Sequence, residues 1–370
     1  MDYNKLRKFI EKSTKPSSIF AKSLFRENIV SQVVQLCTSI SFLLYALVKL
    51  YKIHDSSKNT PLGVDRGNFT YNNCTRIANF FYAISVSAAI LLYKYNSKKY
   101  VNYINYFQSS IKNPFGLKQI LYVNKWQKIN RFIIILLSLT GLTIMTLEFY
   151  YHPFSLTYDY AEIILTYMCE SGLILEQQFV LETCIYLQSN FVFFHLFFDS
   201  LTKKVIENLR VDVYHAIKSV RDIHSQTIEF TRQLDSFFRL KVLNTFGYLA
   251  IYSICNIGLL AAPDQTMIRI LTLIGRAIFI ATILCLSSYH FARVNYLSIQ
   301  VYNKVHDFSL SRNLIRSIET MNEIKLFLLR ISRDDVGFTL AGQCVVSVNF
   351  ISSLAIITLT IGLALPGFFK

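Results

Sequence analysis

Apolar residues along this chain lie in long blocks without a charged side chain, rather than at the spaced positions that face a soluble core. A helix needs about 20 predominantly apolar residues to cross a hydrocarbon core of about 30 Å, and each block approaches or exceeds that length. The pattern therefore predicts an all-α membrane protein with seven transmembrane helices. The blocks are Ile29–Val48, Ile77–Tyr93, Phe132–Leu147, Thr183–Phe198, Val242–Pro263, Ala277–Ala292 and Val336–Phe369.

The last block, Val336–Phe369, is the longest, and it ends one residue before the end of the sequence. One continuous helix of that length would measure about 51 Å, which exceeds the thickness of the hydrocarbon core. We therefore expect part of this block to lie outside the lipid and the rest to form the final span.

Two stretches between the blocks carry apolar residues at helical spacing opposite a charged face. The first covers 201–241, with a stripe from Val205 to Phe238, and the second covers 293–335, with a stripe from Val294 to Leu328. An apolar stripe needs a packing partner. We expect the two stretches to pack together as a helical domain at the inner membrane face, either within one subunit or between several.

Basic residues are concentrated in every second loop between the apolar blocks. Of its 38 Lys and Arg residues, 30 lie in 1–28, 94–131, 203–241 and 293–333, whereas the alternate loops are poor in them. The positive-inside rule then predicts a cytoplasmic N-terminus and, after seven crossings, an extracellular C-terminus. The basic excess thus points to anionic lipid head groups as partners, and nucleic acid is not expected.

Two features fall on the side that this topology makes extracellular. The sequons at Asn68 and Asn73 lie in the first outer loop and predict N-glycosylation there. The seven cysteines lack metal-ligand spacing, and Cys74 and Cys169 are the two near the outer face, which leaves open a disulfide between the first and second outer loops.

The C-terminal block carries residues that resemble a family signature. Phe338–Gly342 looks like the Phe-rich opening of the pattern, and Thr360–Phe368 matches its nine-residue close in length and at both ends. Ser347 replaces the usual acidic residue, Ile361 the usual Tyr and Gly367 the usual Gln. These residues, the number of spans and the predicted orientation together resemble those of the insect gustatory receptors and, more distantly, of the insect odorant receptors. The chain looks like a divergent member of the gustatory receptor family.

The resemblance implies a tastant-gated, non-selective cation channel for monovalent and divalent cations in the plasma membrane of a gustatory neuron. It implies a homotetramer, or a heteromer with related receptors, in which the last helix of each subunit lines a central pore and inner helices form an anchor. Sugar-sensing members carry Glu where this chain has Gly362, which favours bitter or other tastants. The expected segments are 1–28 (N-terminal, cytoplasmic), 29–200 (transmembrane helices 1–4), 201–241 (cytoplasmic helical loop), 242–292 (transmembrane helices 5 and 6), 293–341 (cytoplasmic anchor) and 342–370 (pore helix).

The expected pore residues combine small or polar positions with a hydrophobic ring that excludes water when the channel is closed. Thr360 supplies a hydroxyl, and Leu363 supplies the constriction. Gly362 and Gly367 leave space, and Pro366 before Gly367 could expose backbone carbonyls.

Ionisable residues inside predicted spans are costly and therefore mark functional sites. We expect Glu182 and Arg276 at similar depth, either paired or both facing a ligand pocket among spans two to six; a purely structural ion pair is the alternative. Aromatic rings near the pocket could stack on a sugar or alkaloid. The full set of expected ligand residues is Glu176, Gln178, Glu182, Arg276, Tyr150, Tyr151, Tyr167, Tyr248 and Asn256.

Signatures of enzymes are missing from the sequence: it has no Walker loop, dinucleotide fingerprint, zinc-protease motif or nucleophile elbow. We predict that the chain is not an enzyme and that it uses no cofactor or metal. A transporter and a G-protein-coupled receptor remain alternatives. The basic N-terminus opposes the receptor topology, and the lack of an internal repeat opposes the transporter.

Overall fold

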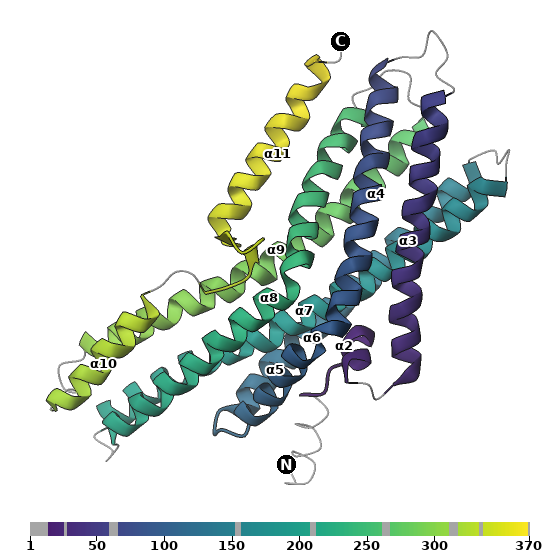
Figure 1. Ribbon diagram of the computed structural model, residues 1–370. Coiled ribbons are helices and arrows are strands. Elements are labelled where there is room, and N and C mark those ends of the chain that lie inside the picture. Colours follow the sequence, from purple (N-terminus) through teal and green to yellow (C-terminus); the bar gives the residue numbers. More distant parts are fainter. Residues whose placement is uncertain are drawn as a thin grey trace.

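The computed structural model describes residues 14–25, 28–58, 66–151, 157–207, 212–260, 267–310, 317–332 and 336–368, and nearly all of them are helical (Figure 1). The helices run roughly along one long axis. The elements are α2 (Ile19–Leu24), α3 (Ile29–Lys58), α4 (Arg66–Tyr95), α5 (Ser97–Ser110), α6 (Gly116–Tyr151), α7 (Thr157–Ile206), α8 (Val213–Leu260), α9 (Met267–Leu310), α10 (Ile318–Ile331), β1 (Thr339–Leu340), β2 (Cys344–Val345) and α11 (Val348–Phe368).

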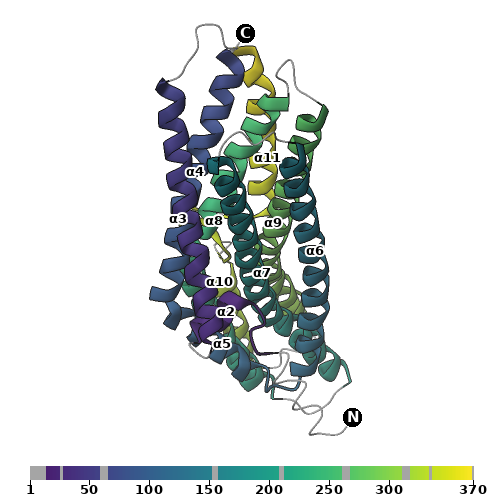
Figure 2. The same ribbon diagram turned by 90° about the vertical axis from the view of Figure 1, so that its right-hand side faces the viewer.

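The molecule has two ends. We call the end that holds α2, α5, α10 and the adjoining parts of α6, α7, α8 and α9 the inner bundle, and the opposite end the outer half (Figures 1 and 2). Helix α11 stands in the outer half, where it packs on α8. The two long helices α7 and α8 belong to both ends.

Four described helices contain a stretch that is long and apolar enough to cross a membrane: Ile29–Asp55, Asn73–Tyr95, Gly116–Ile144 and Ile270–Leu310. About two thirds of each such stretch lies at the surface of the subunit, as expected for helices that face lipid or other subunits. Helix α11 carries a shorter apolar stretch, Val348–Ala364.

The described parts of the two amphipathic stretches, 201–207 with 212–241 and 293–310 with 317–332, are almost entirely helical, as predicted from their spacing. Helix α7 continues to Ile206, and α8 begins at Val213 and runs unbroken into the outer half. Their apolar stripes pack within this one chain: Ile217, Phe238 and Val301 are completely or almost completely buried. The arrangement within one subunit is therefore sufficient to cover most of both stripes.

The uncharged block Thr183–Phe198 is not placed as predicted. It lies in the inner bundle, at the level of α5, where Phe107 stacks near Tyr186 with ring centroids 4.7 Å apart. Helices α5, α6, α8 and α9 surround it. Its lack of charge thus reflects enclosure by protein rather than by lipid, and the part of α7 in the outer half lies closer to Thr157.

The final block is divided between two structures, as its length required. Thr339–Leu340 pairs with Cys344–Val345 in an antiparallel hairpin, and α11 begins only at Val348, six residues later than the predicted start of the last helix. The turn holds Gly342 at φ 81°, a conformation that suits a residue without a Cβ. The family-like opening of the sequence therefore forms a clamp before the helix.

Candidate ligand and pore sites

An aromatic layer joins α4 to α8 in the outer half. The rings of Tyr82 and Tyr248 stack with centroids 3.6 Å apart, and Tyr252 lies 5.5 Å from Tyr248. The Tyr248 hydroxyl donates to Asn79 Oδ1 at 2.5 Å. The half-buried Arg276 of α9 interacts electrostatically with Tyr248. Two of the predicted ligand residues, Tyr248 and Arg276, are thus brought into one region of the subunit.

Glu176 lies elsewhere, in a buried ion pair at the junction between the outer half and the inner bundle. Its Oε2 atom is 2.7 Å from Lys241 Nζ, and the two side chains are 0% and 2% exposed. Tyr93 donates its hydroxyl to the other carboxylate oxygen at 2.8 Å. Glu176 therefore ties α7 to α4 and α8, and Gln178 beside it is half-buried.

Glu182 holds the N-terminal segment onto the inner bundle. Its carboxylate accepts hydrogen bonds from the backbone N–H groups of Ser17 at 2.7 Å and Ser18 at 2.9 Å. The side chains of Tyr186 and Gln127 donate to the same group at 3.0 and 3.4 Å. No sequence pattern predicts this contact, because two of the four donors are backbone N–H groups, which every residue except proline carries.

The predicted pairing of Glu182 with Arg276 is wrong. Helices α7 and α9 run in the same direction, and Gln177 Nε2 donates to Ser287 Oγ at 2.8 Å. Glu182 follows Gln177 by five residues, whereas Arg276 precedes Ser287 by eleven. By this contact the two residues are sixteen positions apart along the bundle, and by the contact of His195 with Leu297 they are eight positions apart, so at about 1.5 Å per residue they are separated by about 12–24 Å.

Of the remaining predicted ligand residues, Tyr167 has a described side chain. Tyr167 is 45% exposed at the surface of the subunit. The side chains of Tyr150, Tyr151 and Asn256 lie outside the described part of the structure.

The features predicted for the outer loops differ from expectation. Cys74 is an exposed free thiol on α4, and Cys169 is a buried free thiol on α7, so the disulfide between them is wrong. Helix α4 already begins at Arg66, so the sequons at Asn68 and Asn73 lie in helical backbone rather than in a loop. Asn73 accepts a hydrogen bond from Arg76 at 3.5 Å, and the side chain of Asn68 lies outside the described residues.

Helix α11 has two different faces. Phe350, Ile351 and Leu354 pack against the core that α8 helps to form, and the ring of Phe350 lies 5.4 Å from that of Phe246 on α8. Gly362 is buried and continues this stripe at helical spacing. Gly362 therefore faces its own subunit, which corrects its prediction as a pore residue.

The opposite face of α11 is uncovered in the single subunit. Leu363 and Ile356 are each 66% exposed, and Thr360 lies between them on the exposed side. By helical spacing Gly367 falls on this face too, although the side-chain environment of Pro366 and Gly367 is outside the described residues. This face is available to a pore, to lipid or to neighbouring subunits.

A hairpin clamp fixes the start of α11. Asp235 of α8 accepts two hydrogen bonds from Thr339, from its N–H at 2.6 Å and from its hydroxyl at 2.7 Å. The completely buried Phe338 packs against Phe238 and Phe291. The motif Phe338–Gly342 is recognisable from the sequence, whereas its contact with Asp235 becomes visible only in the folded chain.

Taken together, the arrangement is that of a polytopic helical membrane protein whose last helix stands at the edge of the subunit. No family model and no curated protein sequence matches the chain. Among solved structures, the insect olfactory receptor OR5 from Machilis hrabei matches it over 99% of both chains, with 14% identity and a TM-score of 0.72 for its complex with eugenol and 0.71 for the receptor alone. The chain thus shares the fold of this insect olfactory receptor, which confirms the predicted all-α membrane class.

Proposed function

We propose that this protein is a chemoreceptor subunit that forms a ligand-gated cation channel, with α11 at the pore. The observation that carries the proposal is the match of the whole fold, from the N-terminal segment to α11, to an insect olfactory receptor. The uncovered face of α11 supports it, because a helix that presents Ile356, Thr360 and Leu363 needs a partner outside its own subunit.

The pore would form where copies of α11 meet around a central axis, in a homotetramer or in a heteromer with related receptors. Leu363 would close it as a hydrophobic ring, and the Thr360 hydroxyl would face passing ions. The positive-inside charge distribution supports a cytoplasmic N-terminus and an extracellular end of α11. Anionic lipid would then contact the basic residues of the inner bundle.

The ligand would bind in the outer half, near the layer that contains Tyr82, Tyr248 and Arg276. Stacked rings and a guanidinium suit a small aromatic or hydroxylated molecule. A gustatory role is the narrower form of the proposal, and it rests on the C-terminal residues that resemble the gustatory signature. The relative from Machilis hrabei binds eugenol, so an odorant is the competing ligand class.

The test is whole-cell recording from cells that express this chain alone, with surface labelling as a control. The panel contains bitter compounds, sugars and volatile aromatic alcohols such as eugenol. Current evoked by a tastant and carried by both Na⁺ and Ca²⁺ is expected. Current evoked only by volatiles would replace the gustatory role by an olfactory one. Surface protein that gives no current, alone or with a related receptor, would contradict the channel.

A cysteine pair tests the pore helix. In Leu363→Cys the thiol lies on the uncovered face, so a charged, membrane-impermeant thiol reagent is expected to reduce the evoked current at least tenfold. Leu354→Cys is the matched control, because Leu354 is half-buried against the core and its thiol should stay protected. The unmodified chain is treated in parallel, because it carries the exposed Cys344. Equal block of the two variants would refute the orientation of α11.

A further inference from the structure

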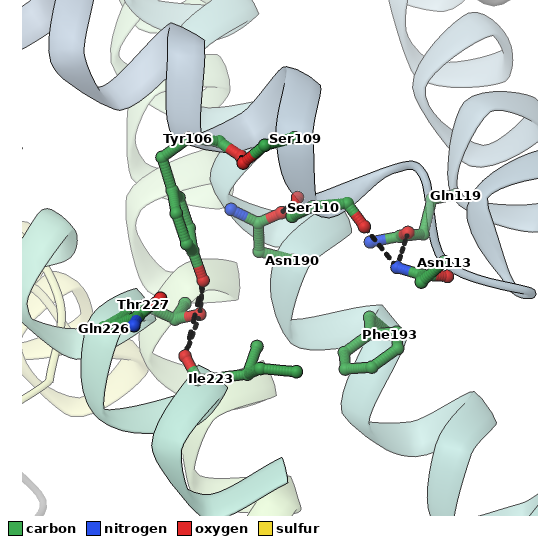
Figure 3. Close-up of a pocket in the computed structure, with 10 residues that line it drawn as sticks. All are labelled: Tyr106, Ser109, Ser110, Asn113, Gln119, Asn190, Phe193, Ile223, Gln226 and Thr227. Atoms are coloured by element: carbon green, nitrogen blue, oxygen red, sulfur yellow. Dashed lines mark hydrogen bonds between the residues drawn. The ribbon is translucent and has the colours of Figure 1, made fainter. Parts of the chain in front are cut away.

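A cavity of about 230 Å³ lies in the inner bundle, far from α11 and from the aromatic layer of the outer half that contains Tyr82 and Tyr248. It opens to the surface and is bordered by α5, the start of α6, α7 and α8, and Figure 3 shows the side chains that line it. None of the residues predicted to bind a ligand lines it. The lining residues are Tyr106, Ser109, Ser110, Asn113, Gln119, Asn190, Phe193, Ile223, Gln226 and Thr227.

Most polar groups of the cavity are fixed by hydrogen bonds to one another. The Tyr106 hydroxyl lies 2.8 Å from Thr227 Oγ1 and 3.3 Å from the backbone oxygen of Ile223. Asn113 Nδ2 donates to Gln119 Oε1 at 3.1 Å. The walls are therefore held in place by their own contacts, as in a preformed binding site.

Asn190 differs from these groups. Its side chain is only 3% exposed, and its Nδ2 atom has no hydrogen-bond partner among the described residues. Figure 3 shows this nitrogen directed toward the space beside Tyr106. An amide nitrogen buried without a partner is unfavourable, so a partner supplied by a bound molecule would stabilise the site.

The amide of Asn190 can offer either of its polar atoms to the cavity. The Ser110 hydroxyl donates to two acceptors, Asn190 Oδ1 at 3.3 Å and the backbone oxygen of Phe107 at 2.8 Å, which share its one proton. If the amide turns over, its nitrogen donates to Ser110 and its oxygen faces the cavity. A hydroxyl group, which both donates and accepts, satisfies both orientations.

We propose that this cavity is a second binding site, for a small neutral molecule that carries several hydroxyl groups. The ten lining residues include no charged side chain, which disfavours a phosphate or a carboxylate as the ligand. The rings of Tyr106 and Phe193 offer apolar contact to a carbon skeleton. The volume lies below that of usual sites for drug-sized ligands and suits a single six-membered ring.

A molecule bound here would connect helices that belong to different parts of the chain. Asn190 lies on α7, Gln119 on α6 and Thr227 on α8, whereas Tyr106 lies on α5. Occupancy would therefore stabilise the inner bundle as a unit. This binding does not depend on the proposed channel function, because it is measured on the purified protein without any current.

The experiment measures binding of myo-inositol to the full-length protein in detergent, by the thermal midpoint and by radiolabelled inositol. A saturable rise of the midpoint is expected. Betaine, a neutral osmolyte without hydroxyl groups, corrects for general stabilisation by osmolytes. Asn190→Leu should weaken binding roughly five- to tenfold, because it removes the buried hydrogen bond while it keeps the size of the side chain.

Two further variants complete the design. Gln226→Leu changes an exposed residue at the rim, so it should fold normally and weaken binding two- to threefold. Asn102→Leu is the matched control, since Asn102 is an exposed residue of α5 outside the cavity, and it should bind as the unmodified protein does. If Asn190→Leu does not fold, Gln226→Leu decides the test.

Three results would overturn the proposal. Binding that does not saturate would mean that the cavity holds only water. Equal affinity of Gln226→Leu, Asn190→Leu and the unmodified protein would place the inositol elsewhere. Tighter binding of inositol phosphate than of inositol would contradict the neutral ligand class.

Discussion

The buried ion pair between Lys241 and Glu176 gives the sharpest test of how the two ends of the subunit are joined. We change Lys241 to Met, which keeps much of the unbranched side chain and removes the charge. Glu176 then remains as an unpaired carboxylate with only the Tyr93 hydroxyl beside it. Because neither side chain of the pair has significant contact with solvent, water cannot replace the lost ammonium.

The magnitude follows from the geometry. At 2.7 Å and an effective dielectric constant of about 20, the gross attraction of the pair is about 6 kcal/mol, most of which offsets the cost of removing both charges from water. Removal of one partner of such a pair costs about 3–5 kcal/mol. At roughly 2 °C per kcal/mol, Lys241→Met should lower the thermal midpoint by about 6–10 °C.

The assay is fluorescence-detected size exclusion after heating at one fixed rate, because membrane proteins of this size rarely unfold reversibly. The double variant Lys241→Met, Glu176→Gln should recover most of the loss, since no buried charge remains. Lys203→Met is the matched control: its ion pair with Glu207 is largely exposed, and its loss should cost well under about 1 kcal/mol. A double variant as unstable as Lys241→Met alone would refute the reasoning.

Three further predictions concern the inner bundle and the hairpin. Glu182→Ala removes the acceptor for the N-terminal segment, so trypsin should cleave after Lys22, the exposed lysine of α2, roughly tenfold faster; an unchanged rate would contradict the anchoring role. Burial lowers the pKa of His224 to about 4, below its value of about 6.5 in the unfolded chain. The free energy of unfolding should therefore fall by up to about 3 kcal/mol as the pH drops from 6.5 to 4. The variant His224→Phe should lack this part of the pH dependence in unfolding assays. Thr339→Val removes one hydrogen bond to Asp235, so amide exchange in the hairpin should accelerate roughly fivefold, whereas an equal increase throughout α11 and α8 would indicate global rather than local loosening.

Helical periodicity predicted the inner helices well, because burial against protein leaves a one-sided stripe that can be read from the sequence. Val294 and Val301 of the second stripe are completely buried. Ile318 and Met321, which belong to the same predicted stripe, are 79% and 41% exposed. The spacing shows which residues share a face, but the number of neighbouring helices decides how much of that face is covered.

Apolar composition could not distinguish lipid from protein as the surroundings of a helix. Thr183–Phe198 has the composition of a span, yet it is enclosed by four helices of the inner bundle. Both environments exclude water, so both select uncharged residues. The same ambiguity explains the wrong prediction for Glu182, which lies beside Ser17 and Ser18 rather than at the depth of Arg276.

The candidate sites depended on the relative axial positions of helices, which no local pattern contains. The separation of Glu182 from Arg276 follows from the contact of Gln177 with Ser287, two residues that are 110 positions apart. The cavity around Asn190 likewise combines four helices, and each of its lining residues is ordinary in its own sequence context. Such sites become visible only when the helices are packed.

The unbroken course of α8 has a mechanical consequence. Its 48 residues form one continuous helix with an axial rise of about 72 Å, which changes direction between the inner bundle and the outer half (Figure 1) and contacts α4, α5, α10 and α11. One helix thus joins the contacts of both ends, so a shift at one end would reach the other along a single continuous element.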